Sequence, residues 1–216
     1  MTRVRRSQEE RRRDTQQAVL DAVIELLLER GYAKMTAADV AARAGVSRGA
    51  QSHYFRTKLD LTIAAAQRAM AASLELAESM AETAIRSDDP LGVFIAQSRR
   101  FFLEPRYVAM IEILLVARTD LPLSKEFSEL ILTTRQRMES IWLSVFKHAG
   151  LSDELAYAVL IMTHHLMRGM AMSTLWRSEP REMEDIIARW TTMAHGLLEA
   201  ERLAKTHASM RRLNRP

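Results

Sequence analysis

Apolar residues recur at helical spacing along almost the whole chain, and this periodicity constrains the fold more than any other feature. Near the start, Val19, Ala22, Val23, Leu26 and Leu27 share one face of a helix with about 3.6 residues per turn. The alternation of apolar and polar residues that marks a half-buried strand does not occur convincingly anywhere in the sequence. The pattern therefore predicts an all-α protein.

Turn-forming residues divide this pattern into about nine helices. The breaks fall at Gly31, Gly45, Gly150 and the Pro-containing stretches 88–90, 104–105, 121–122 and 178–180. Helix-start signals agree, because Thr36 with Asp39 fits a capping box. Thr57 with Asp60 fits another. The Ala-rich stretch 59–84 is predicted to form one long helix, which connects a front segment, residues 1–58, to a rear segment, residues 59–204.

The composition excludes several classes of protein. Of the 216 residues, 48% are hydrophobic and 27% are charged, which is ordinary for a folded soluble protein and excludes wholesale disorder. There is no Cys, so disulfides, cysteine-ligated metals and thiol nucleophiles are excluded. The basic N-terminus resembles the start of a signal peptide, but Asp21 and Glu25 interrupt the stretch that follows. The charge-free stretch 155–167 falls short of the roughly 20 residues that span a bilayer. We therefore expect a cytoplasmic protein.

The charge is concentrated at the two ends of the chain. Residues 1–13 hold six Arg against two Glu, and residues 202–216 hold five basic residues and no acidic one. Residues 61–201 hold 14 basic and 19 acidic residues. The N-terminal arm, residues 1–13, is expected to precede the first helix, and it either contacts a polyanion such as DNA or is a solvated terminus. Its arginines are Arg3, Arg5, Arg6, Arg11, Arg12 and Arg13. The basic tail, residues 205–216 with Arg211, Arg212 and Arg215, is expected to be disordered.

The stretch that begins at Thr36 reads as two short helices joined by a tight turn. Its letters are TAADVAARAGVSRGAQSHYFRTK. Val40, Ala41 and Val46 are predicted to face inward, and Gly45 allows the positive φ that the turn needs. Ser47 is placed to cap the second helix. Arg48, Gln51 and other polar side chains are then left outside. This pattern favours a DNA-binding helix-turn-helix over a plain helical hairpin, because such a motif presents its second helix to the major groove.

The match is closer than a generic helix-turn-helix. The series Thr36-x-x-x-Val40-Ala41-x-x-Ala44-Gly45-Val46-Ser47-x-Gly49, followed by His53-Tyr54-Phe55-x-x-Lys58-x-x-Leu61, strongly resembles the tetracycline-repressor (TetR) family over residues 14–65. The resemblance implies a homodimeric transcription regulator. Its N-terminal three-helix domain, residues 1–58, would bind a palindromic operator, and its ligand-binding and dimerisation domain, residues 59–204, would bind an inducer.

The resemblance also assigns roles at the DNA interface. Arg48, Ala50 and His53 would approach base edges or the nearby DNA backbone, with Gly49 allowing close approach. The residues that would hold phosphates are Thr36, Ser47, Tyr54 and Lys58. Gln51 stands where the family often has an apolar residue, and it is a candidate to contact adenine.

The rear segment holds two further sets of candidate residues. Met and aromatic side chains adapt to varied apolar ligands, although core packing is the alternative role for each of them. The candidate ligand-pocket residues are Phe94, Phe101, Phe102, Met110, Trp142, Phe146, Met162, His165 and Met170. Within the last long helix an apolar seam is predicted to form the dimer interface, unless it only closes the core of the monomer. Its residues are Met183, Ile186, Ile187, Trp190, Met193 and Leu197.

Motifs for catalysis and cofactor binding are not expected. The neighbouring His164 and His165 point about 100° apart on a helix, which argues against a metal site. Ser144 and Lys147 match S-x-x-K, but the companion motifs are absent, and there is no glycine-rich phosphate loop. We therefore predict no catalytic residue, no metal and no cofactor.

The sequence as a whole predicts a ligand-responsive, homodimeric transcriptional regulator, most simply a repressor. It would bind a palindromic operator and leave it when a small, largely apolar effector binds. One alternative is an effector-independent DNA-binding regulator or activator. Another is a small helical enzyme.

Overall fold

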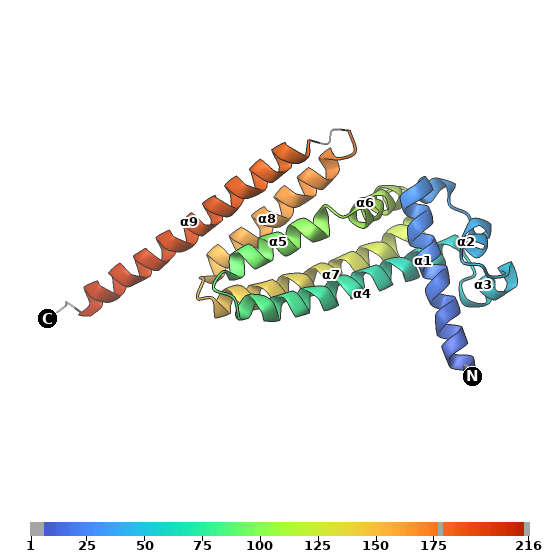
Figure 1. The fold of residues 1–216 in the computed structure, drawn as a ribbon, viewed down its shortest axis with the longest axis horizontal. Helices are drawn as coiled ribbons and strands as arrows, with labels where there is room; N and C mark the ends of the chain where they lie inside the picture. The colour runs from blue at the N-terminus through green and yellow to red at the C-terminus, as the bar shows by residue number, and fades with distance from the viewer. Residues whose placement is uncertain (1–6, 177–178, 214–216) are drawn as a thin grey trace, which may run out of the picture. The chain divides into compact units, whose positions relative to one another are not determined.

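The computed structural model describes residues 7–176 and 179–213, which form nine helices and no strand (Figure 1). The all-α prediction is confirmed for this part of the chain. The helices are α1 (Gln8–Lys34), α2 (Ala37–Arg43), α3 (Arg48–Tyr54), α4 (Lys58–Ile85), α5 (Pro90–Phe102), α6 (Pro105–Ala117), α7 (Leu121–His148), α8 (Asp153–Ser173) and α9 (Pro180–Leu213). Between residues 7 and 213, outside the two undescribed positions, no helix is both long enough and apolar enough to cross a membrane.

The capping residues predicted from the sequence start the helices where expected. The hydroxyl of Thr36 accepts the N–H of Asp39, whose carboxylate accepts the N–H of Thr36 in return. Thr57 and Asp60 exchange the same pair of bonds, each 3.0 Å long, at the start of α4. Each pair satisfies two backbone donors that the first turn of a helix leaves free.

The first helix begins earlier than the sequence suggested. Ser7 forms a capping box with Glu10, in which its hydroxyl accepts the Glu10 N–H at 3.1 Å. The expectation that residues 1–13 precede the first helix is therefore wrong from residue 8 onward, and Arg11, Arg12 and Arg13 lie within α1. The other arginines of the arm, Arg3, Arg5 and Arg6, lie outside the described residues.

The chain packs as two compact units. One, here called the HTH unit, contains the residues up to Ala72 together with Pro105–Thr134. The second unit contains Ser73–Glu104 and the residues from Arg135 onward. Helices α4 and α7 each run through both units. Helix α6 and the first half of α7 belong to the same unit as the helix-turn-helix. The predicted domain boundary between residues 58 and 59 remains a prediction.

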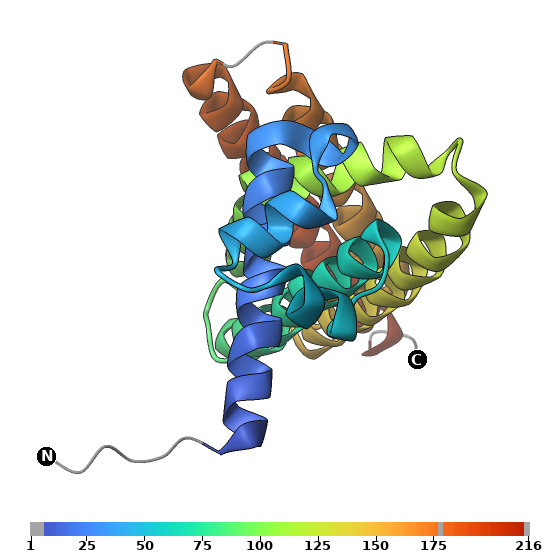
Figure 2. The ribbon, with the colours of Figure 1, turned by 90° about the vertical axis from the view of Figure 1, so that its right-hand side faces the viewer.

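The core of the HTH unit forms around one face of α1. Val19, Val23 and Leu26 of this helix are almost fully buried, together with Leu61 of α4 and Phe127 of α7. Burying a side chain of this size contributes roughly 1.5–3 kcal/mol. The apolar stripe that the sequence predicted for α1 is thus the surface on which the unit assembles. Helices α2 and α3 pack beside α1 (Figure 2).

The core of the second unit is aromatic. Phe94 of α5 makes edge contacts with Trp142 and Phe146 of α7, each with ring centroids 5.0 Å apart. All three side chains are at most 1% exposed. Trp190 of α9 donates its indole N–H to the hydroxyl of Thr163 of α8 at 2.9 Å. This buried bond satisfies both polar groups and fixes α9 against α8.

Helix α9 extends to Leu213, beyond the boundary at residue 204 that the sequence predicted (Figure 1). The expectation of disorder from residue 205 is therefore wrong for residues 205–213, whose backbone is helical. Lys205 contributes to this extension, because its ammonium donates to the carbonyl of Gly150 at 2.8 Å. Arg215 lies outside the described residues, as do the side chains of Arg211 and Arg212.

Candidate nucleic-acid interface

The turn between α2 and α3 is closed by backbone hydrogen bonds. The N–H of Val46 donates to the carbonyl of Ala41 at 3.0 Å, and Gly45 adopts φ of 66°. Val40 and Ala41 are at most 2% exposed, so the predicted inward face is confirmed. Ser47 then starts α3, because its hydroxyl accepts the N–H of Ala50 at 3.1 Å. The geometry is that of a helix-turn-helix.

Helix α3 leaves a polar surface open to solvent. The side chains of Arg48, Ser52 and His53 are exposed, and Gly49 is exposed between them. Tyr54 is half-buried and makes an edge contact with the ring of His53, with centroids 5.1 Å apart. The predicted base-reading side chains Arg48 and His53 therefore lie on an accessible surface at the two ends of α3.

Gln51 is buried, although the sequence predicted it to be exposed. Its side chain is only 2% exposed, and its amide nitrogen donates to the carbonyl of Phe55 at 2.6 Å. The expectation that Gln51 lies outside is wrong, and its burial argues against the predicted contact with adenine. An amide side chain can be buried here because the carbonyl of Phe55, at the C-cap of α3, accepts its hydrogen bond. Gln51 thereby closes the end of α3.

Lys58 lies at the start of α4, next to the last turn of α1. Its ammonium is 4.1 Å from the centroid of the Tyr32 ring and 3.5 Å from the carbonyl oxygen of Ala33. Burial lowers the pKa of the ammonium from its usual value. Lys58, which is predicted to contact a phosphate, is thus half-buried and has a defined position on the protein. Thr36 and Ser47, which are exposed, both use their hydroxyls as helix caps.

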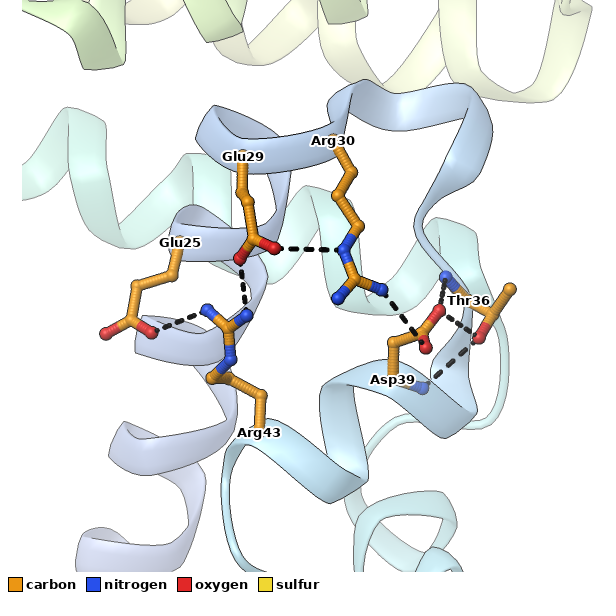
Figure 3. Close-up of polar contacts among 6 residues, drawn as sticks. All are labelled: Glu25, Glu29, Arg30, Thr36, Asp39 and Arg43. Carbon is orange, nitrogen blue, oxygen red and sulfur yellow. Dashed lines mark hydrogen bonds and ion pairs between the residues drawn. The ribbon is translucent and has the colours of Figure 1, made fainter.

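An ion-pair cluster connects α1 to α2 (Figure 3). The guanidinium of Arg43 contacts Glu29 and lies 3.2 Å from the carboxylate of Glu25, while Arg30 lies 3.1 Å from Glu29 and 3.5 Å from Asp39. Hydrogen bonding from Arg43, with a smaller contribution from Arg30, lowers the pKa of Glu29. These largely exposed pairs each add little stability, but several of them join α1 to α2 at the same place. The cluster was not predicted from the sequence, because its partners belong to two different helices.

The nine candidate ligand-pocket residues do not form one group. Phe94, Phe102, Trp142, Phe146 and Met170 are buried in the second unit, and Phe101 is half-buried. Met110 belongs to α6 and packs against the core of the HTH unit instead. Met162 and His165 lie on the exposed side of α8, with Met162 51% exposed.

His164, which the sequence analysis only considered as a metal ligand, belongs to the aromatic cluster. Its ring lies 5.6 Å from Phe94 and 5.1 Å from Phe102, and Arg168 stacks over Phe102 at 5.5 Å. Burial, aided by the charge of Arg168, lowers the pKa of His164 to about 3. The ring is therefore neutral at pH 7. Among the described residues, no three His, Asp or Glu side chains are grouped to hold a metal ion.

The predicted dimer seam divides between two faces of α9. Trp190 and Ile187 are buried within the chain, and Trp190 bonds to α8. Met193 is 63% exposed and Leu197 is 45% exposed. Met183 and Ile186 are half-buried. One apolar face of α9 thus packs into the chain's own core, and another apolar face is exposed.

Comparison with known proteins decides the family. The model for bacterial regulatory proteins of the tetR family matches residues 19–65. The HTH-type transcriptional regulator CymR of Pseudomonas putida is 31% identical over 186 residues, which are 86% of this chain and 92% of CymR. The chain belongs to the TetR family of transcriptional regulators. Members of this family bind DNA and are not enzymes.

Solved structures of transcriptional regulators share the fold over most of the chain. One, a TetR-family regulator from Mesorhizobium loti, has a TM-score of 0.70 at 16% identity and covers 88% of this chain and 98% of its own. FadR from Bacillus subtilis, solved in complex with stearoyl-CoA, has a TM-score of 0.56 at 17% identity, with coverage of 85% and 95%. At these identities the likeness concerns the TetR fold alone.

Proposed function

We propose that the chain is a cytoplasmic, homodimeric repressor that binds a palindromic operator and leaves it when a small, largely apolar effector binds. The observation that carries the proposal is the apolar surface left open on α8 and α9. Met162 of α8 and Met193 and Leu197 of α9 are each at least 45% exposed. Exposed apolar side chains at helical spacing on neighbouring helices are typical of a protein interface.

The DNA-binding geometry also supports a dimer. A recognition helix as short as α3, seven residues long, contacts only one half-site in the major groove. Two copies related by a twofold axis bind two half-sites as one event, which multiplies their affinities. On each copy Arg48 and His53 would read base edges, with Gly49 and Ala50 against the backbone. Thr36, Ser47, Tyr54 and Lys58 would contact phosphates.

The dimer is tested by replacing Met193 and Leu197 together with Asp. In an interface each carboxylate would lose its hydration without a partner, so the variant should be monomeric. Sizing chromatography with light scattering should give a mass near the 24.6 kDa of one chain. The matched control replaces Leu121 and Leu132 of α7, 82% and 55% exposed, with Asp. A dimer that survives the α9 changes would move the interface elsewhere.

The effector would be apolar because the core of the second unit is aromatic around Phe94. FadR of the same family fold holds stearoyl-CoA, which supports an apolar-tailed ligand for this fold. Trp142, packed against Phe94, serves as a reporter of binding. Titration with stearoyl-CoA and with shorter fatty acids should change its fluorescence and release bound DNA. A panel of apolar compounds that never releases DNA would favour the effector-independent regulator. Footprinting on DNA that flanks the gene would locate the operator.

A further inference from the structure

The last turn of α1 is set off from the rest of the helix by Gly31. This residue has φ of 74° and ψ of 167°, which interrupts the helical backbone. The N–H of Tyr32 donates to a carboxylate oxygen of Glu112 at 2.7 Å. The partner lies 80 residues away, on α6. Glu112 therefore acts as a cap, from a distant helix, for the turn that carries Tyr32.

Glu112 can reach this turn because Gly31 has no side chain. A Cβ built at Gly31 would overlap Oε1 of Glu112 and would lie 3.1 Å from its Cδ. An L-residue is also strained at this positive φ. Position 31 thus favours glycine for two independent reasons, its positive φ and the nearby carboxylate of Glu112. Both preserve the contact between Glu112 and Tyr32.

The ring of Tyr32 in turn holds Lys58. The ammonium lies 4.1 Å from the ring centroid, on the face where the quadrupole of the ring attracts a cation. The carbonyl of Ala33, in the same turn, lies 3.5 Å from the ammonium. A shift of the turn would therefore move both groups that define the position of Lys58.

We propose that Glu112 and Tyr32 are positioning residues for Lys58: Glu112 fixes the Tyr32 turn, and the Tyr32 ring holds the Lys58 ammonium at the start of α4. The part of this inference that concerns DNA rests on the proposed function, in which Lys58 contacts a phosphate. A lysine held in place loses less rotamer freedom on binding than a free one. A phosphate, with its full charge, is a stronger partner than the ring and the long carbonyl contact, so binding need not be blocked. Helix α6 thereby sets the geometry of one DNA contact.

The first test observes Lys58 without DNA. In the full-length protein labelled with 13C at lysine Cε, the Lys58 signal should show an upfield ring-current shift, and Lys58→Arg identifies it. Tyr32→Phe keeps the ring and should keep the shift, whereas Tyr32→Leu should abolish it. Glu112→Ala should reduce the shift, and Glu112→Gln, which retains an acceptor oxygen, should largely restore it. An unchanged Lys58 signal in Glu112→Ala, with the fold intact by circular dichroism, would overturn the proposal.

The second test is a double-mutant cycle on DNA binding. The probe is a duplex selected by the wild-type protein from a random pool, titrated at two salt concentrations. Tyr32→Leu should weaken binding by about threefold to tenfold in the wild-type background and have no effect in Lys58→Ala. Equal weakening in both backgrounds would overturn the positioning role of Tyr32. If Lys58→Ala alone leaves binding unchanged, the phosphate role in the proposed function is wrong, while the lysine spectra still decide whether Glu112 and Tyr32 hold Lys58.

Discussion

Nε2 of His195 lies 2.8 Å from a carboxylate oxygen of Asp89, while Nδ1 of the same ring lies 2.8 Å from the carbonyl oxygen of Thr191. Both neighbours are acceptors when Asp89 is ionised, so the ring satisfies them only by carrying a proton on each nitrogen. This arrangement therefore favours the charged imidazolium form of His195. Because Asp89 also caps α5 by accepting the N–H of Gly92, the pair connects α9 to the start of α5.

This pair predicts that stability falls as pH rises. The hydrogen bond to Asp89 is the main cause that raises the pKa of His195 above its usual value, so the folded state favours the charged ring. The stabilisation is complete below the unfolded pKa of about 6.5 and is lost as pH rises through the folded pKa. Since His195 is 38% exposed, the effect should be about 0.5 kcal/mol. Thermal melts from pH 5.5 to 8.5 should show the advantage of wild type over His195→Gln shrinking with pH. His148→Gln, at an exposed position, is the control, and an advantage that is constant with pH would contradict the assignment.

Gln51 should act on stability and not on base preference. Replacing it with Leu removes the donor to the Phe55 carbonyl and should cost about 1–3 kcal/mol. Gln51→Ala should cost more, because it also leaves a cavity. Urea denaturation measures the stability, and selection from a random DNA pool measures the preference. A changed consensus sequence in Gln51→Leu would return this residue to the DNA surface.

Arg48→Ala and Lys58→Ala should weaken DNA binding in different ways. Arg48 is exposed at the start of α3, so its loss should cost about 1–3 kcal/mol and relax the preference at one base position. Loss of Lys58 should weaken all sequences similarly and reduce the salt slope by about one. Titrations of matched and mismatched operators at several salt concentrations separate the two. Identical profiles for the two variants would refute these roles.

Gly31 and Gly45 provide a matched comparison of two glycines with positive φ. Around Gly45 there is open space for a Cβ, so Gly45→Ala pays only the backbone strain of about 1–2 kcal/mol. Gly31→Ala should cost more, since the new methyl group also displaces Glu112. The excess should vanish in the Glu112→Ala background, as measured by urea denaturation. Equal costs for the two glycines would mean that Glu112 moves aside freely.

Local features of the fold were predictable because the residues that specify them are close in sequence. Thr36 with Asp39 and Thr57 with Asp60 are three residues apart, and their caps formed as predicted. Gly45 likewise specified its own turn. Periodicity gave the apolar faces of the helices for the same reason.

Contacts between distant helices were not predictable in this way. The pattern of α9 put Trp190 and Met193 on one seam, but it cannot say which of them faces α8 and which stays open. Gln51 was predicted to be exposed because polar side chains usually are. Its hydrogen-bond partner, the carbonyl of Phe55, becomes available only where α3 ends. Tyr32 and Glu112 lie 80 residues apart, so no local rule connects them.

The ion pairs between α1 and α2 would affect which cations near the helix-turn-helix are available to DNA. Arg30 precedes the helix-turn-helix and Arg43 ends its first helix, yet each is already paired with carboxylates. Such arginines displace few condensed counterions from a duplex, because their charge is neutralised within the protein. This pairing would reduce the affinity of the region for arbitrary DNA, whereas Arg48 is exposed. If the chain binds an operator as proposed, these carboxylates would widen the gap between operator binding and the background of non-specific sites, without contacting DNA themselves.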